Sequence, residues 1–377
     1  SWVTRAGSLS NLEQKDFPLP ELDGADFVLV KVTNCGINFA DIFACLGLYS
    51  ATPKGEFTPG LEFSGIVEEV RLPDDGSEPP HSFKKGDKVM GVTRFGGYSS
   101  HVLTHYGYIR ELPKDWSLVE GSAFLCKSLT AWYGLVHLGS LCPPSITPSR
   151  VEKALGRKIV MIQSAAGGVG LWALNICAFC DAVPIAVVGN EQKKNFLVKE
   201  KGLHEQQVIV RGTGAQFEGQ IRTALDWIAE LPAFRNQTVD GVSVVFDAVA
   251  GDYFTPSYNA LARGGKYIIY GAAQYMSACG NFPNYLKLGW KYVWRPKLDP
   301  MEMITENKAV LGFNLIWMWD KVELMEQMLN DMMEEDNEWN KPHVPNIFAF
   351  DDALDAIHKM QKGETVGNLV LQLESQE

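Results

Sequence analysis

Small residues gather between two apolar runs in the stretch QSAAGGVG (163–170). The run before it, KIVMIQSA, is typical of a buried strand, and the run after it, VGLWALNICAFC, is typical of a helix. Ala165, Gly167 and Gly170 have the spacing of the dinucleotide fingerprint G-x-G-x-x-G, with alanine in the first place. The missing side chains let the backbone approach a pyrophosphate, and the helix start at Gly168 and Val169 supplies N–H groups and a positive dipole. The stretch therefore predicts a dinucleotide site; the alternative is a tight turn that binds nothing.

The end of the next apolar run, VPIAVVGN, distinguishes the two nicotinamide dinucleotides. An NAD enzyme places Asp or Glu there, roughly 20 residues after the glycines, on the ribose hydroxyls. This run ends at Gly189 and Asn190. Glu191 follows directly and could bind the ribose hydroxyls, so NAD is an alternative cofactor. Lys193 follows closely, and Arg211 ends the run after that, QQVIVR. Cations suit a 2′-phosphate, so NADPH is the predicted cofactor, with surface lysines at an exposed helix start as the alternative.

Strands and helices alternate around this motif. Strands that alternate with helices imply crossover connections and a parallel sheet, so residues 131–280 are predicted to form a Rossmann NADP-binding domain. The apolar runs that predict its strands are KIVMIQSA, VPIAVVGN, QQVIV, VSVVFDAV and GKYIIYGAA.

The two ends of the chain have a different pattern. DFVLVKVT (26–33), LEFSGIVEEV (61–70) and DKVMGVT (87–93) alternate like strands and are separated by Pro, Gly and Asp. Residues 1–130 are therefore predicted to form a β-rich, barrel-like domain. Residues 281–377 are expected to finish the cofactor domain and then return to the first one, with GNLVLQL as a last strand.

Composition limits the partners. The 377 residues, 46% hydrophobic and 21% charged, are enough for about two domains. A formal net charge of −11 argues against nucleic acid as a partner, since a polyanion is bound by clustered Lys and Arg. No apolar run approaches the ~18 residues of a membrane helix. The seven scattered cysteines fit reduced thiols. We expect a cytoplasmic protein. The alternative is a protein whose N-terminal targeting segment has been removed, because the chain lacks an initiator methionine.

Six motifs in a fixed order resemble the medium-chain dehydrogenase/reductase superfamily: CGINFAD, GLY (47–49), PGLEFSGIV, GDKV, LTAWYGL and AAGGVG. The resemblance covers nearly the whole chain, and it is strongest to the zinc-independent quinone oxidoreductase branch. NFAD, GLY and GFNL are similar to vesicle-associated quinone-reductase-like proteins. The resemblance implies an α/β fold, with a GroES-like β-rich catalytic domain and a Rossmann cofactor domain built on a doubly wound parallel sheet. It also implies a homodimer.

The resemblance also bears on zinc, which related alcohol dehydrogenases hold with three protein ligands and one open position. Asn38 and Leu61 stand at the first two ligand positions, and Cys126 stands at the third. Glu62 is retained beside Leu61, but one thiolate and one carboxylate do not make that site. Residues 90–105 also lack the four clustered cysteines of the structural zinc. We therefore expect no metal, with zinc bound through Cys126 as the alternative.

Without a metal, hydride transfer must rely on positioning the nicotinamide and on hydrogen-bond donors near the acceptor oxygen. The resemblance implies that Asn38, Tyr49 and Thr130 line the nicotinamide end, with the Tyr49 phenol as candidate electrophile or proton source. Packing for Tyr49, and backbone or capping roles for the other two, are the alternatives. Gly271 and the Phe313–Asn314 pair match positions where family backbones meet the nicotinamide half.

These expectations describe an NADPH-dependent, zinc-independent reductase that passes hydride to a quinone or another activated α,β-unsaturated carbonyl. The competing hypothesis is a vesicle- or membrane-associated nucleotide-binding protein that acts through lipid or protein contacts. It rests on Trp290, Trp294, Trp317 and Trp319, which lie among basic and apolar residues. A pocket wall, interdomain packing or a dimer interface would explain the same tryptophans. The pattern does not identify the acceptor.

Overall fold

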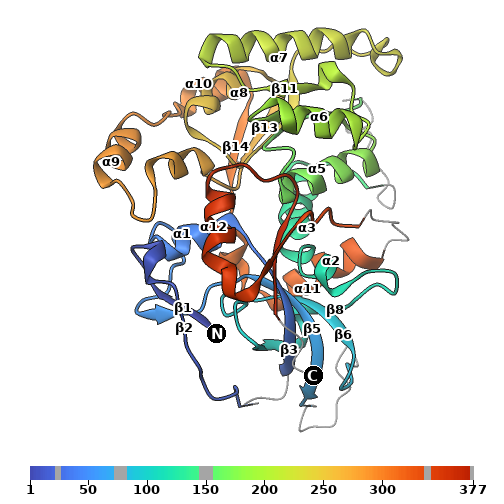
Figure 1. Cartoon of the computed structure of the whole chain (residues 1–377). Coiled ribbons are helices and arrows are strands. Elements are labelled where there is room, and N and C mark those ends of the chain that lie inside the picture. Colours follow the sequence, from blue (N-terminus) through green and yellow to red (C-terminus); the bar gives the residue numbers. More distant parts are fainter. Residues whose placement is uncertain (22–26, 72–82, 144–155, 335–340, 374–377) are drawn as a thin grey trace. The chain divides into compact units, whose positions relative to one another are not determined.

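The computed structural model describes residues 1–21, 27–71, 83–143, 156–334 and 341–373. The chain divides into two units (Figure 1). Unit 1 contains Ser1–Leu129, Cys279–Pro283 and Leu315–Glu377, and unit 2 contains Thr130–Ala278 and Asn284–Asn314.

Unit 2 is built on a six-stranded parallel sheet in the order β11-β10-β9-β12-β13-β14. The chain starts in the middle of this sheet, moves to one edge, and then returns to the middle and fills the other edge. Ligands of such doubly wound sheets bind outside the carboxyl ends of the strands, where the direction reverses, here between β9 and β12. The strands are β9 (Ile159–Gln163), β10 (Val183–Val188), β11 (Val208–Val210), β12 (Val242–Asp247), β13 (Leu261–Ile269) and β14 (Ala309–Gly312).

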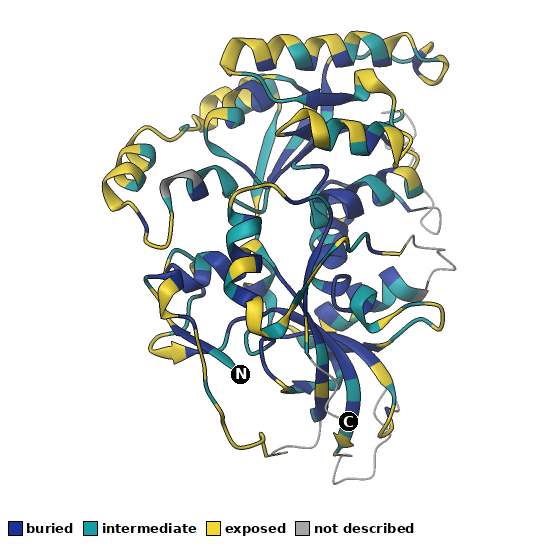
Figure 2. Cartoon of the chain, viewed as in Figure 1, coloured by how far each residue is buried: buried dark blue, intermediate teal, exposed yellow. Residues whose placement is uncertain are grey.

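Helices cover both faces of a doubly wound sheet, which is why its strands are apolar without alternation. In α7 the buried residues recur every three or four positions, at Phe217, Ile221, Ala224 and Ile228, as one face of a helix requires. Figure 2 shows this helix exposed on its outer side and the strands beneath it buried. The helices of unit 2 are α5 (Gly168–Phe179), α6 (Glu191–Lys199), α7 (Gly214–Ala229), α8 (Phe254–Asn259), α9 (Tyr285–Val293) and α10 (Pro300–Glu306), together with the π-helical turn η3 (Tyr133–Leu138).

Unit 1 is β-rich. Its main sheet has seven strands, six of them in the order β15-β16-β3-β5-β6-β8, with β7 paired to β3, and a small sheet has the order β2-β1-β4. Every pair except β15–β16 is antiparallel. The main strands are β3 (Phe27–Gly36), β5 (Glu62–Val70), β6 (Lys88–Val92), β7 (His101–His105), β8 (Ile109–Glu111), β15 (Asn346–Ala349) and β16 (Leu369–Gln372); the small sheet has β1 (Trp2–Arg5), β2 (Glu13–Gln14) and β4 (Glu56–Phe57).

Short helices connect and cover these strands. They are α1 (Phe39–Cys45), α2 (Leu118–Gly121), α11 (Val322–Glu334) and α12 (Ala353–Gln361), while α3 (Leu125–Trp132) runs from unit 1 into unit 2. None of the helices in the described ranges is long and apolar enough to cross a membrane. The predicted fold class, a β-rich domain together with a parallel-sheet Rossmann domain, is confirmed.

Candidate active site and cofactor site

The glycine-rich turn joins β9 to α5 in unit 2. Gly167 is the N-cap of α5, and Ser164 before it has a positive φ of 58°. A Cβ on Gly170 would lie 2.4 Å from the Ser164 carbonyl oxygen and 2.6 Å from the Ala165 Cα, so only glycine lets the helix pack this closely on the turn. A Cβ on Gly167 would meet one atom within 4 Å, the same carbonyl oxygen at 3.3 Å. The third glycine therefore serves packing, and Gly167 leaves the backbone accessible where a pyrophosphate would lie.

Two cations meet at the carboxyl end of β10. The Arg211 backbone N–H donates to the Val188 carbonyl at 3.0 Å, and a Cβ on Gly189 would lie 3.3 Å from the Arg211 guanidinium. Asn190 caps α6 by accepting from the Lys193 N–H at 3.0 Å. Burial lowers the pKa of Lys193, and the charge of Arg211 lowers it further. The structure thus brings together the four residues predicted to read the ribose end of the dinucleotide.

Two residues that the sequence pattern did not identify hold Arg211 in place. Its Nη1 lies 3.5 Å from the Gln163 Oε1 at the end of β9, and its guanidinium lies over the Tyr253 ring, 5.1 Å from the centroid. Burial lowers the pKa of Arg211, while Tyr253 and Asp247 raise it. Gln163 ends an apolar strand beside the glycines, a position where a polar residue is a usable signal.

The places predicted for the nicotinamide half lie at the ends of β13 and β14. A Cβ on Gly271 would lie 2.8 Å from the Ala248 carbonyl oxygen, so this position requires glycine. The Phe313 N–H donates to the Ile269 carbonyl at 3.1 Å, and its ring packs edge-on against Tyr133 at 5.1 Å between centroids. Asn314 directly follows and is half-buried.

Asp247 is a buried carboxylate at the end of β12 and is not among the residues predicted for the site. It accepts from the Val249 N–H at 2.6 Å and from the Tyr267 hydroxyl at 2.7 Å. These bonds fix a turn in which Ala250 has a positive φ of 58°. Burial raises the pKa of Asp247, against these hydrogen bonds and the charge of Arg211, which lower it. An Asp at the end of an apolar strand, in FDAVAG, is the sequence feature that marks it.

In unit 1, Asn38 is the N-cap of α1 and is held by two carboxylates. Its backbone N–H donates to Asp41 Oδ2 at 2.7 Å, and its side-chain Nδ2 donates to Glu62 Oε1 at 3.1 Å. Asp41 also accepts from the Gly60 N–H at 3.2 Å and the Tyr98 hydroxyl at 3.1 Å. Burial raises the pKa of Asp41 to about 6, although these donors lower it. The Asn38 amide is therefore fixed toward Glu62.

Glu62 also holds the first turn of α3. Its Oε2 accepts from the Cys126 N–H at 3.2 Å, and its Oε1 pairs with the Lys127 ammonium. Burial lowers the pKa of Lys127, and the Asp41 carboxylate opposes this shift. No local sequence pattern predicts this pair, because the two residues lie on different elements.

The three zinc-ligand positions do not fit zinc. Leu61 is apolar and buried, and the Asn38 amide donates to Glu62. Burial raises the pKa of the Cys126 thiol to about 12. Its sulfur alone is one ligand, whereas a catalytic zinc site has three protein ligands. Across the described ranges, no group of three or more His, Cys, Asp or Glu side chains is placed to hold a metal ion.

Tyr49 and Cys126 pack, both partly buried, against the same small apolar cluster of Ala51, Leu61 and Ile316. The Tyr49 backbone carbonyl accepts from the Thr52 hydroxyl at 2.7 Å, which fixes the turn after α1. Thr130 lies on α3 and is the first residue of unit 2. Of the three residues predicted to act on the substrate, two therefore belong to unit 1 and one to unit 2.

Comparison with known proteins agrees with this architecture. Residues 24–114 match the model of the alcohol dehydrogenase GroES-like domain, and residues 214–371 match the model of the zinc-binding dehydrogenase. The synaptic vesicle membrane protein VAT-1 homolog of Danio rerio is 28% identical over 348 residues, which cover 92% of this chain and 64% of that protein. The chain thus spans just under two thirds of this relative.

Two further relatives are reductase-like. Quinone oxidoreductase-like protein 2 of Bos taurus is 26% identical over 351 residues, covering 92% of this chain and 85% of that protein. A solved structure of the quinone oxidoreductase from Thermus thermophilus, described together with its NADPH complex, has a TM-score of 0.70 at 22% identity and covers 99% of both chains. Because both halves of the dehydrogenase architecture are matched in sequence and in fold, the chain belongs to the medium-chain dehydrogenase/reductase superfamily of oxidoreductases.

Proposed function

We propose that this protein is an NADPH-dependent, zinc-independent reductase that transfers hydride to a quinone or another activated α,β-unsaturated carbonyl. The observation that carries the proposal is the meeting of Lys193 and Arg211 beside Gly189, where an NAD enzyme would have a carboxylate. The alternative NAD ligand, Glu191, is exposed in the first turn of α6.

Unit 2 supplies the residues that would hold the cofactor. The α5 N-terminus would offer backbone N–H groups to the pyrophosphate, the two cations would pair with the 2′-phosphate, and the backbone at Gly271, which packs against Ala248, would lie beside the nicotinamide half. When bound, NADPH supplies the hydride. The protein's own contribution is to hold the nicotinamide in place and to exclude water.

Unit 1 supplies the groups proposed to face the acceptor. The Tyr49 phenol is a donor for an oxygen that gains negative charge, and the Asn38 amide is kept in one orientation by Glu62. Leu61, Ile316 and Ala51 form an apolar wall beside Tyr49. An apolar wall with few donors suits an uncharged, planar carbonyl acceptor.

Turnover measurements test this proposal. Purified protein is assayed for oxidation of NADPH and NADH with quinones, enones and short enoyl thioesters, while cofactor binding is followed by fluorescence. The proposal predicts a preferred acceptor and a preference for NADPH. Tight NADPH binding without turnover of any acceptor would contradict the reductase function.

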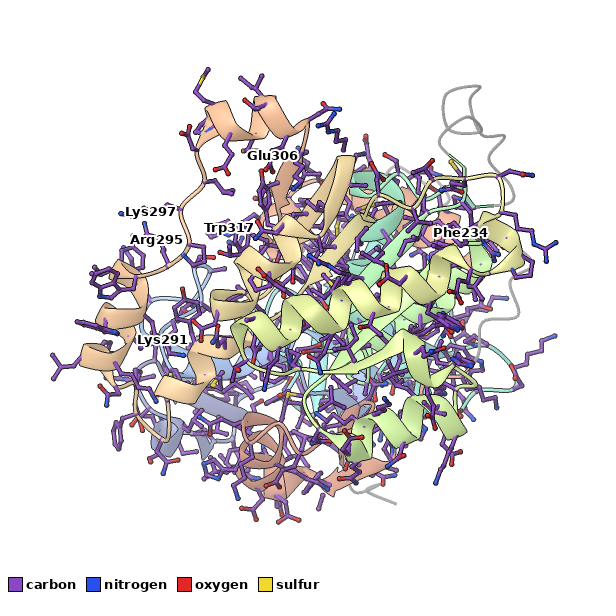
Figure 3. All side chains as sticks on the ribbon, turned by 90° about the horizontal axis from the view of Figure 1, so that it is seen from above. Phe234, Lys291, Arg295, Lys297, Glu306 and Trp317 are labelled. Carbon is purple, nitrogen blue, oxygen red and sulfur yellow. The ribbon has the colours of Figure 1, made fainter. Side chains whose placement is uncertain are left out.

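The exposed surface of α9 favours a second function. This helix buries no residue. Trp290 within it and Trp294, its C-cap, are 67% and 69% exposed. Residues 279–298 contain four cations and no acidic residue, in a chain with a net charge of −11. Figure 3 shows three of these cations, Lys291, Arg295 and Lys297, along this segment. Exposed aromatic and basic side chains close together suit an anionic lipid surface, and we propose that α9 and the residues directly after it contact such a surface.

The other two tryptophans of the predicted patch are not part of this helix. Trp319, in unit 1, stacks on Tyr108 with 3.9 Å between ring centroids. Trp317, also in unit 1, donates to the Ser50 hydroxyl at 3.2 Å. These contacts agree with the packing role that was the alternative for the four tryptophans, and the membrane proposal concerns Trp290 and Trp294 alone.

Co-sedimentation with vesicles tests the membrane proposal. We expect the wild type to bind vesicles that contain anionic lipid, and a Trp290→Ala/Trp294→Ala variant to lose most of this binding. Added salt should weaken the binding, since part of it is electrostatic. A Trp317→Ala variant, which changes an exposed tryptophan of unit 1, serves as the control. Absence of binding by the wild type would rule out the membrane proposal and leave the reductase proposal untouched.

A further inference from the structure

Lys127 and Glu62 form an ion pair in the interior of unit 1. Their side chains are 5% and 1% exposed. Burying a charge is costly unless it is paired and hydrogen-bonded, so such a pair is retained only where its geometry is well satisfied. The pair lies among residues that the proposed reductase function uses.

The Glu62 carboxylate contacts both the Lys127 ammonium and residues at the zinc-ligand positions. Glu62 accepts from the Asn38 side-chain amide at 3.1 Å and from the Cys126 N–H at 3.2 Å, and it follows Leu61 in sequence. Asn38, Leu61 and Cys126 are the residues that stand where zinc enzymes of this superfamily have their ligands. The positive charge in this region is thus a lysine ammonium on α3.

The surroundings hold Glu62 in this position. A Cβ on Gly36 would lie 2.4 Å from Glu62 Oε1 and 2.2 Å from the Ser122 carbonyl oxygen, so the carboxylate fills the space that a side chain would need. Asp41, the other buried carboxylate of this region, has its own donors in the Asn38 N–H, the Gly60 N–H and the Tyr98 hydroxyl. The Lys127 ammonium is therefore the positive charge that pairs with the Glu62 carboxylate.

We propose that the Lys127 ammonium takes the electrostatic place of the metal in unit 1: it keeps Glu62 ionised, and Glu62 in turn fixes the Asn38 amide and the first turn of α3. Lys127 acts through Glu62 and is a positioning residue. Its effect on turnover rests on the proposed reductase function, whereas its effect on stability does not.

Chemical rescue tests the need for a cation. Lys127→Ala should lower Tm by roughly 5–15 °C, because it leaves a buried carboxylate without its partner. n-Propylammonium has the length of the deleted side chain and should restore part of Tm and of kcat, whereas the equally long, neutral n-propanol should not. Equal recovery with both compounds, or recovery with neither, would overturn the proposal.

A double variant that replaces both charges with neutral side chains distinguishes the effect of the pair on kcat from its effect on stability. Lys127→Met combined with Glu62→Gln should regain most of the Tm that Lys127→Met alone loses, because no buried charge is left unpaired. Its kcat with the acceptor should remain on the order of 10-fold to 100-fold lower, because the Asn38 amide is no longer held by a carboxylate. NADPH affinity should change far less than kcat, since the residues proposed to bind the pyrophosphate and the 2′-phosphate lie in unit 2. Wild-type kcat and acceptor KM in this variant, or no gain in Tm over the single variant, would contradict the proposal.

Lys308 offers a matched control. Its side chain is 8% exposed and pairs with Glu306 at 2.8 Å, but it belongs to unit 2. Lys308→Ala should lower Tm and leave the acceptor KM unchanged. If the wild type reduces no acceptor, the reductase function fails, and the Tm measurements still decide whether Lys127 is the required cation.

Discussion

Lys193 and Arg211 are positive charges held near each other in a partly buried place, and they come from two different elements. Burial lowers the pKa of each side chain, which means that their charged forms are less well solvated than in water. A bound dianion would compensate both charges. This is a physical reason for a preference for the phosphorylated dinucleotide.

Replacing both cations with alanine should therefore weaken NADPH binding by about 100-fold or more, since each charge-assisted hydrogen bond contributes roughly 1.5–3 kcal/mol. NADH affinity should change little. The two Kd values are measured by fluorescence titration of the Lys193→Ala/Arg211→Ala variant. Lys199→Ala, at the exposed end of the same helix, is the control. Equal losses for both cofactors would show that these cations do not read the 2′-phosphate.

Tyr49 is the residue proposed to donate to the acceptor oxygen. Tyr49→Phe keeps the ring that packs on the apolar cluster and removes the hydroxyl. We expect kcat to fall by about 10-fold or more and the Kd for NADPH to stay the same. Tyr292→Phe, which alters an exposed tyrosine on α9, should behave like the wild type. Unchanged kcat in the Tyr49 variant would leave Tyr49 with a packing role only.

At the scale of the elements, local patterns were enough to predict the strands and the helix that carry the proposed cofactor residues. VPIAVV lies on a strand covered on both faces, so its apolar run without alternation predicts β10 directly. Glycine spacing likewise predicts the turn between β9 and α5. The contacts of Glu62 with Asn38 and Lys127 were not predictable, because β5, α1 and α3 meet only in the folded unit and no local pattern encodes their side-chain pairs.

The close packing of α5 on the turn after β9 predicts how a glycine-to-alanine substitution there changes stability. Gly170→Ala should lower the free energy of unfolding by roughly 1–3 kcal/mol and weaken NADPH binding, because its Cβ would press on the Ser164 and Ala165 backbone. Gly219→Ala should instead raise stability by about 0.5–1 kcal/mol, because Gly219 lies on exposed α7 with nothing within 4 Å of its Cβ. Urea unfolding measures both. A Gly170 variant as stable as the wild type would contradict the close packing of α5 on the turn.

At the scale of the whole molecule, the chain enters unit 2 at Thr130 and returns to unit 1 for its last strand. The order of motifs predicted the two kinds of architecture. A cytoplasmic location and a homodimer remain predictions. The proposed reductase function assigns the nucleotide to residues of one unit and the acceptor to residues of the other, and it predicts that turnover needs both.

Transfer of deuterium from NADPH to product tests this claim most directly. Purified protein is incubated with NADPH deuterated at the transferable position of the nicotinamide and with the best enone of the acceptor panel, and the product is analysed by mass spectrometry. The reductase account predicts one deuterium on the β-carbon of the saturated product, and a much slower reaction with deuterated NADH. Product without deuterium, or no product from any acceptor despite bound NADPH, would contradict it.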